Sequence, residues 1–167
     1  MRILIDTNIF IYREADQVLS ENQQILNKTL HEIGAIQIIH PSSVKEIEKN
    51  PDPGKKMIML SKIRAYPQLE SPPDPLQDSG FCAQIAPKPG TNDEIDNALL
   101  YCVCRDAVDY LITEDRKIIA KALWNYCQDT NQAVYIDNIL YSTIDYRTQF
   151  FSNRLKETGI GKNSFNR

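Results

Sequence analysis

The chain has 167 residues, of which 42% are hydrophobic and 25% are charged, and its formal net charge is −3. This length and apolar content predict one folded domain spanning residues 1–167 and exclude an intrinsically disordered chain. No apolar run reaches the roughly 20 residues that span a bilayer. The opening MRILIDTN lacks the pattern of a secretory signal peptide. We therefore expect a cytoplasmic protein without a membrane segment.

Charge is distributed unevenly along the chain. Residues 147–167 contain five basic residues and one acid, Glu157, so a basic tail follows an acidic body. This asymmetry fits a polyanionic partner combined with an acidic metal pocket, and it fits a solvated basic end equally well. The four cysteines and two histidines do not have the spacing of a zinc site, so we expect reduced, semi-buried cysteines.

Short apolar runs alternate with longer amphipathic stretches in chain order. We expect strands at 2–6, 35–40, 108–113 and 133–136, and helices at 8–14, 16–31, 42–49, 55–65, 91–106 and 115–127, with 138–157 helical in part. Residues 67–90 are rich in proline and predict a long loop or ordered arm, which in a small domain is often functional. The alternation predicts an α/β sandwich around a mainly parallel sheet.

Two acids follow predicted strands in closely similar contexts. Asp6 ends the run ILID, and Asp115 follows the run YLIT. The carboxyl ends of parallel strands meet at one edge of a sheet, where functional groups gather. One such acid is usually a helix cap or a turn residue, but two from separate strands indicate a shared site.

Three further acids lie on predicted helices. Glu46 fits the capping box Ser43-x-x-Glu46, which explains it as well as a ligand role does. Asp93 and Asp96 are three residues apart beside the apolar stripe of their helix, in its first turn, where the helix dipole favours anions. An unpaired carboxylate beside a buried stripe is costly, and a metal ion would remove that cost.

A cluster of acids from separate segments favours a hard divalent cation. Magnesium takes carboxylate oxygens together with water and substrate phosphate, whereas the same carboxylates without a cation repel one another. Such a site suits phosphodiester hydrolysis, because a bound ion lowers the pKa of water and a second ion can stabilise the leaving oxygen. The pattern does not distinguish one ion from two.

These motifs together resemble the PIN-domain family of metal-dependent ribonucleases. The matching pieces are ILIDTNIFIY, Glu46, DNALL with Asp96, and VDYLITEDRKI, which carries Thr113 and Asp115; they cover most of residues 1–136. The resemblance implies a three-layer α/β/α sandwich with a central parallel sheet. It also implies an acidic quartet of Asp6, Glu46, Asp96 and Asp115 that binds Mg²⁺ or Mn²⁺.

The resemblance assigns further roles. Asp93 would be an auxiliary metal ligand, and Asn8 and Thr113 would orient the carboxylates. RNA would be the substrate, a homodimer or an antitoxin could be a partner, and some similar domains are joined to a second domain. Basic residues that could contact RNA are Lys45, Arg116 and Lys117, which also fit solvated helix faces.

Two alternatives remain open. One is a catalytically silent PIN-like domain that binds nucleic acid or protein, which the presence of all four acids disfavours. The other is a different magnesium-dependent phosphotransfer enzyme. A dehalogenase-type phosphatase needs D-x-D where this chain has Asp6-Thr7-Asn8, and a P-loop enzyme needs a glycine-rich turn after the first strand, which is absent.

Overall fold

The computed structural model describes residues 1–85, 90–128 and 139–141, with the backbone alone for 123–128 and 139–141. The strand expected at 133–136 and the basic tail at 147–167 lie outside the described residues.

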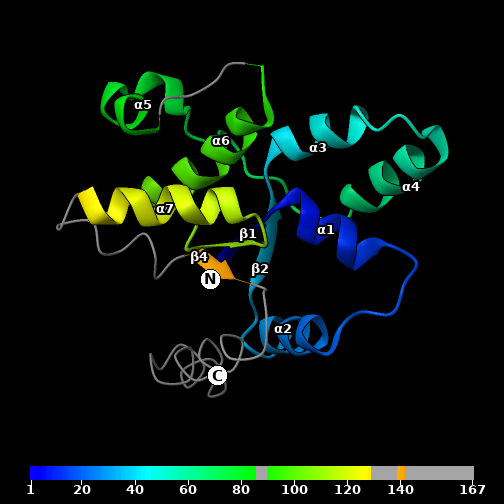
Figure 1. Cartoon of the computed structure of the whole chain (residues 1–167). Helices are drawn as coiled ribbons and strands as arrows, with labels where there is room; N and C mark the ends of the chain where they lie inside the picture. Colours follow the sequence, from blue (N-terminus) through cyan, green and yellow to red (C-terminus); the bar gives the residue numbers. More distant parts are fainter. Residues whose placement is uncertain (86–89, 129–138, 142–167) are drawn as a thin grey trace.

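Four parallel strands form the sheet (Figure 1). They are β1 (Arg2–Ile5), β2 (Ile36–Ile39), β3 (Tyr110–Thr113) and β4 (Ile139–Tyr141), in the order β2-β1-β3-β4. The predicted parallel α/β architecture is confirmed. Within 138–157, which was expected to be helical in part, residues 139–141 form a strand along β3, and the remaining residues lie outside the described part of the chain.

The helices fall close to their predicted positions. They are α1 (Thr7–Glu14), α2 (Glu21–Glu32), α3 (Pro41–Glu48), α4 (Pro53–Ile63), α5 (Ser79–Ile85), α6 (Asn92–Cys104) and α7 (Arg116–Gln128), with a 3-10 turn, η1, at Pro75–Gln77. Helix α2 begins later than predicted because Ser20 and Gln23 form a reciprocal capping box. It ends as predicted before Gly34, whose φ of 61° suits glycine.

Side chains on the strands alternate between two cores, one on each face of the sheet. Leu4 and Leu111 point toward α5, α6 and α7, whereas Ile5 and Ile112 point toward α1 to α4. Helices therefore cover both faces, an arrangement compatible with a three-layer sandwich.

The proline-rich segment 67–90 is ordered over its described part. Ile39 in β2 donates its N–H to Pro67 O and accepts from Leu69 N–H, both at 2.9 Å, so this segment covers the end of the edge strand. Further along, the ring of Phe81 packs at 4.6 Å from that of Tyr101 in α6. The segment is thus an ordered arm packed against α6.

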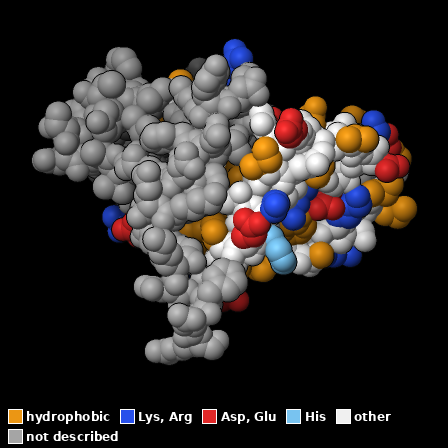
Figure 2. Space-filling model, turned by 90° about the horizontal axis from the view of Figure 1, so that it is seen from below, with side chains coloured by type: hydrophobic (Ala, Val, Ile, Leu, Met, Phe, Trp, Pro, Cys, Tyr) orange, Lys and Arg blue, Asp and Glu red, His pale blue; other side chains and the backbone are white. Residues whose placement is uncertain are grey.

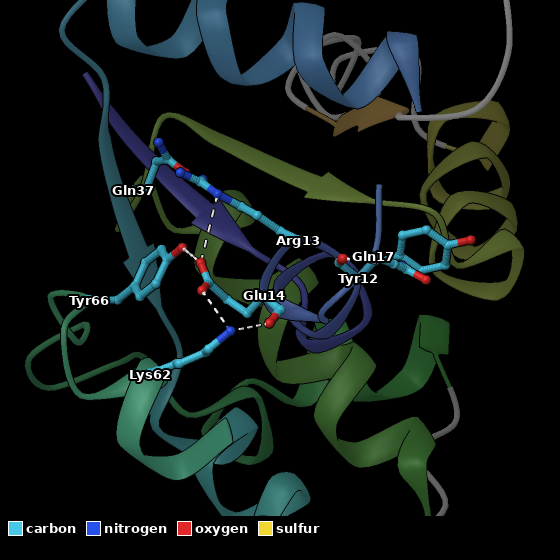
Figure 3. A network of polar contacts seen from close by, with 7 residues as sticks. All are labelled: Tyr12, Arg13, Glu14, Gln17, Gln37, Lys62 and Tyr66. Carbon is cyan, nitrogen blue, oxygen red and sulfur yellow. Dashed lines mark hydrogen bonds and ion pairs between the residues drawn. The ribbon is translucent and has the colours of Figure 1, made fainter. Parts of the chain in front are cut away.

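A polar network ties α1 to β2 and α4 (Figure 3). Tyr66 donates its hydroxyl to Glu14 at 2.5 Å, and Lys62 donates to the Glu14 backbone carbonyl. Arg13 reaches Gln37 in β2 and lies over the Tyr66 ring. Burial and the bond to Glu14 raise the pKa of Tyr66 to about 12, so the phenol stays a donor at neutral pH. These contacts fix the far end of α1, whose first residue follows Asp6.

One face of the molecule carries a mixture of charges among its visible described residues. On the side of α2 and the amino ends of the strands, basic, acidic and apolar side chains of the visible described residues are interspersed (Figure 2). None of the helices within the described ranges is both long and apolar enough to cross a membrane. Among the described residues, Cys82, Cys102 and Cys104 form no disulfide, and burial raises the pKa of Cys102 to about 12.

Candidate metal site at the carboxyl edge of the sheet

The strand order places a topological switch point between β1 and β3. From β1 the chain moves first to β2 and later to β3 on the other side, so the connections leaving β1 and β3 diverge. Ligand sites of open α/β sheets form outside the carboxyl ends of strands at such a point. Asp6 follows β1, Thr113 ends β3, and the Asp6 N–H donates to Ile112 O at 3.0 Å.

A hydrogen-bonded chain joins the two strand ends. The Thr113 hydroxyl donates to Asp6 Oδ2 at 2.7 Å and accepts from the Asp115 N–H at 2.9 Å. Thr113 is fully buried, so these bonds fix one oxygen of Asp6 in a single orientation. Thr113 has the geometry expected of an orienting residue.

Asp6 is a buried carboxylate without a capping role. It occupies the N-cap position of α1 but makes no side-chain capping bond, and its residue surface is only 4% exposed. Burial raises its pKa most, the bond from Thr113 lowers it, and the charges of Glu46 and Asp115 raise it. The net shift is upward, so the ionised form of Asp6 is disfavoured here.

Asp115 combines a structural role with proximity to Asp6. Its Oδ1 accepts the Lys117 N–H at 2.6 Å and its carbonyl accepts from Ile119 N–H, as in a helix cap at the start of α7. Its other carboxylate oxygen has no hydrogen bond among the described residues. The capping interpretation therefore accounts for half of this carboxylate.

Glu46 does not belong to the predicted capping box. Helix α3 begins at Pro41 with His40 as its cap, so Ser43 lies inside the helix instead of at its N-cap. The shift arises because His40 Nδ1 accepts the Ser42 N–H at 3.1 Å and proline starts a helix readily. Glu46 is half-buried, and its charge acts on Asp6. The structural explanation that competed with a ligand role is thereby removed.

Asp96, on α6, has a carboxyl group whose pKa is raised well above its ordinary value. Burial, followed by the charge of Asp115, raises its pKa to about 6; Asp6 and Asp93 act in the same direction, and Lys121 opposes them. The four predicted acids therefore interact electrostatically at one edge of the sheet, although they come from four separate segments.

Asp93, which was expected to be an auxiliary metal ligand, forms an ion pair with Lys121. Lys121 on α7 lies 3.4 Å from Asp93 Oδ1 and donates to Asn97 Oδ1 at 2.8 Å. Asp93 is thus neutralised by an ammonium group in this structure. Neither Lys121 nor Asn97 was anticipated from the sequence. Asn97 follows Asp93 by four residues on the same helix face, which was a usable signal, whereas the reach of Lys121 from α7 depends on tertiary packing.

The remaining predicted residues lie on the surface. Asn8 is exposed and forms no side-chain hydrogen bond with described residues, so the expected orienting contact is not formed. Lys45, Arg116 and Lys117 are also exposed, the first on α3 and the others in the first turn of α7.

The donor set suits a hard cation. Two buried hydroxyl oxygens without a hydrogen-bond partner lie near the acids in sequence: Thr7 Oγ1 follows Asp6, and Ser43 Oγ precedes Glu46 by about one helical turn. Within the described residues no three His, Cys, Asp or Glu side chains already converge closely enough to hold an ion. Repulsion between uncompensated carboxylates works against such convergence, and a cation reverses it. The carboxylate oxygens are of the chemical type that Mg²⁺ or Mn²⁺ binds, and their convergence on an ion would require the side chains to move.

No protein-family model matches this chain, and neither a curated protein nor a solved structure matches it. The functional interpretation therefore depends on the residues and the geometry described above.

Proposed function

We propose that this chain is a metal-dependent phosphodiesterase of the PIN type that cleaves RNA. The observation that carries the proposal is the mutual electrostatic influence of Asp6, Glu46, Asp96 and Asp115 at the switch point of the sheet. A folded protein gains nothing in stability from such a cluster, because each carboxylate raises the cost of ionising the next. A divalent cation explains why the charges are gathered there.

The residues have distinct parts in the proposed reaction. A bound Mg²⁺ or Mn²⁺ would lower the pKa of a water molecule to supply the nucleophile and would stabilise charge on the phosphate. Thr113 holds one oxygen of Asp6 and leaves the other oxygen for a ligand. Asp115 uses Oδ1 as a cap and keeps Oδ2 available. Lys121, anchored to Asn97, adds a fixed positive charge beside Asp93.

RNA as the substrate is supported by the order and context of the motifs, which resemble those of PIN ribonucleases. An antitoxin, a second copy of the chain or an associated domain would be a partner by the same resemblance. A binding role without catalysis is the competing outcome, and the experiment below separates the two.

The test is a cleavage assay on single-stranded RNA with the purified protein in Mg²⁺, in Mn²⁺ and in EDTA. We expect cleavage with either metal, none in EDTA, and a loss of at least about a hundredfold in Asp6→Asn, because transition-state stabilisation of that size is typical for a central ligand or electrostatic group. Asp16→Asn, at an exposed loop position, is the matched control and should cleave like the wild type.

Two results would contradict the proposal. One is the absence of cleavage by the wild type under every metal condition while RNA is still bound, which supports the silent binding module. The other is cleavage that persists in Asp6→Asn, which points to a contaminating nuclease. Calorimetric titration of the protein with Mn²⁺ measures metal binding directly and does not require the correct RNA.

A further inference from the structure

A cavity of about 330 Å³ is lined in part by α3 and α6, the helices that carry Glu46 and Asp96. Three parts of the chain line it: α3, the proline-rich arm at 72–76, and the start of α6 with Gly90 and Thr91. Its volume lies at the lower end of the range for small-ligand sites, which is roughly 300–1,000 Å³. The ordered arm, which has no part in the proposed catalysis, therefore forms one wall of this cavity.

The walls of the cavity are largely apolar. Pro72, Pro73, Pro75 and Leu76 line it from the arm, and Ile95 and Ala98 line it from α6. Leu76 is 57% exposed, so its side chain is accessible to a ligand in the cavity. Proline rings and a leucine side chain offer flat and compact apolar surface to a planar group.

Two lysine amines at the cavity are available to an anionic ligand. Within the described part of the chain, Lys45 and Lys49 form no ion pair or hydrogen bond through their amines, and both are exposed. The two acids at the cavity are occupied internally: Asp74 accepts from Leu76 N–H at 3.0 Å, and Glu94 accepts from Gly90 N–H at 3.0 Å. Both carboxylates keep their charge, but the two lysine amines are the charged groups of the lining that have no partner among the described residues.

His40 adds an uncharged ring to this lining. It is 6% exposed, and its Nδ1 accepts the Ser42 N–H, which places the ring proton on Nε2. Burial, with a smaller effect from Lys45, lowers its pKa to about 4. The ring is neutral at physiological pH and contributes no competing charge.

The cavity and the acidic cluster share their supporting helices. Lys45 lines the cavity and is followed directly by Glu46, and Ile95 lines it and is followed directly by Asp96. Successive residues of a helix are rotated by about 100°. The acid and the cavity-lining residue therefore lie on neighbouring faces of each helix.

We propose that this cavity is a base pocket, which holds one nucleobase of a single-stranded nucleic acid while Lys45 and Lys49 contact its phosphates. The inference rests on the proposed function, since it assigns the pocket to the substrate that the acidic cluster cleaves. A planar base fits the apolar walls, the phosphates fit the free lysines, and the shared helices bring the adjoining phosphodiester to the acids. An acidic peptide would meet the lysines but would leave the apolar walls unused.

The test measures binding in EDTA, so that it does not depend on cleavage. A short fluorescent single-stranded RNA is titrated by anisotropy against the wild type, and the titration is repeated with an abasic RNA of equal length. Leu76→Ala should weaken binding of the base-containing RNA by about fivefold or more and should not affect the abasic RNA, because apolar contact with a base is lost. Lys49→Gln should weaken binding of both and reduce its salt dependence.

Two matched controls exist in the chain. Ile58→Ala removes an apolar side chain of similar exposure, 51%, from α4, and Lys28→Gln removes an exposed lysine from α2. Both should bind RNA like the wild type. The base pocket is overturned if Leu76→Ala binds like Ile58→Ala, if abasic RNA binds as tightly as normal RNA, or if a glutamate-rich peptide displaces the RNA at equal charge concentration.

The two proposals can fail separately. Base-dependent binding without any metal-dependent cleavage would retain the pocket and refute the nuclease. Cleavage that is lost in Asp6→Asn, combined with binding that is indifferent to Leu76 and Lys49, would retain the nuclease and refute the pocket.

Discussion

Removing the charge of Asp96 should stabilise the metal-free protein. The pKa of Asp96 is about 6 in the folded protein and 3.8 as its ordinary value, so the folded state holds this proton more tightly than the unfolded state. Stability therefore falls as the pH rises from about 4 to about 6, and the penalty is fully present at pH 7. Substitution by asparagine keeps the size of the side chain and removes the penalty.

The magnitude follows from the pKa difference. Each pKa unit corresponds to about 1.4 kcal/mol, which gives about 3 kcal/mol for the full shift. Asp96 is half-buried, so water screens part of this effect, and we expect Asp96→Asn to raise the free energy of unfolding by about 1–2 kcal/mol at pH 7. For a chain of this length that corresponds to an increase of roughly 2–8 °C in the melting temperature.

The assay is urea unfolding followed by circular dichroism, in EDTA, at pH 7 and at pH 4. The stabilisation should be present at pH 7 and should vanish at pH 4, where Asp96 is protonated in the folded protein. Asp16→Asn on an exposed loop is the control and should change stability little at either pH. Mg²⁺ should then stabilise the wild type more than Asp96→Asn, because only a ligand-competent site gains binding free energy. The reasoning is refuted if Asp96→Asn is less stable than the wild type at pH 7 in EDTA.

Three other substitutions probe separate parts of the structure. Thr113→Val removes the hydrogen bond to buried Asp6 and should cost about 1–3 kcal/mol in urea unfolding at pH 7. Lys121→Met removes the cation that opposes the pKa shift of Asp96, so the pKa measured by carboxyl-carbon NMR should rise above that of the wild type. Gly34→Ala places a side chain at a φ of +61° and should lower the free energy of unfolding by about 1 kcal/mol in the same urea assay.

Each of these changes has a matched control. Thr113→Ser keeps the hydroxyl and should retain most of the stability that Thr113→Val loses. Lys121→Arg keeps the positive charge and should leave the carboxyl pKa near its original value. Gly54→Ala lies in α4, where the added carbon meets only the Asp52 carboxylate at 3.4 Å, and should cost less than Gly34→Ala. A substitution that behaves like its control would contradict the role assigned to that residue.

The first three strands were predictable because each is a short apolar run that ends at a polar residue. Residues such as Leu4 and Leu111 are buried on one face while their neighbours are buried on the other, so these strands show no alternation of polar and apolar residues. The sequence pattern also placed Asp6 and Asp115 at strand ends, and the strand order determines that these ends are adjacent.

Features that depend on tertiary contacts were not predictable. The start of α3 was predicted to within one residue, but the capping box Ser43-x-x-Glu46 does not form because His40 caps the helix, and the choice between the two caps requires knowledge of where β2 ends. The pairing of Lys121 with Asp93 depends on how α6 and α7 pack, and their sequence separation carries no local signal. Composition identified the proline-rich arm, but its order arises from contacts with β2 and α6.

The false capping box alters the weight of Glu46 in the candidate site. A glutamate at the third position of a helix is explained fully when its carboxylate closes a capping box, and no ligand role is then needed. Because α3 begins at Pro41, Glu46 lies in its second turn, half-buried, with its charge raising the pKa of Asp6. A half-buried acid that acts unfavourably on a buried acid has a stability cost and no compensating local bond within the described residues. A cation shared between the two carboxylates would remove that cost, so the absence of the capping box is an additional argument for a metal at this edge of the sheet.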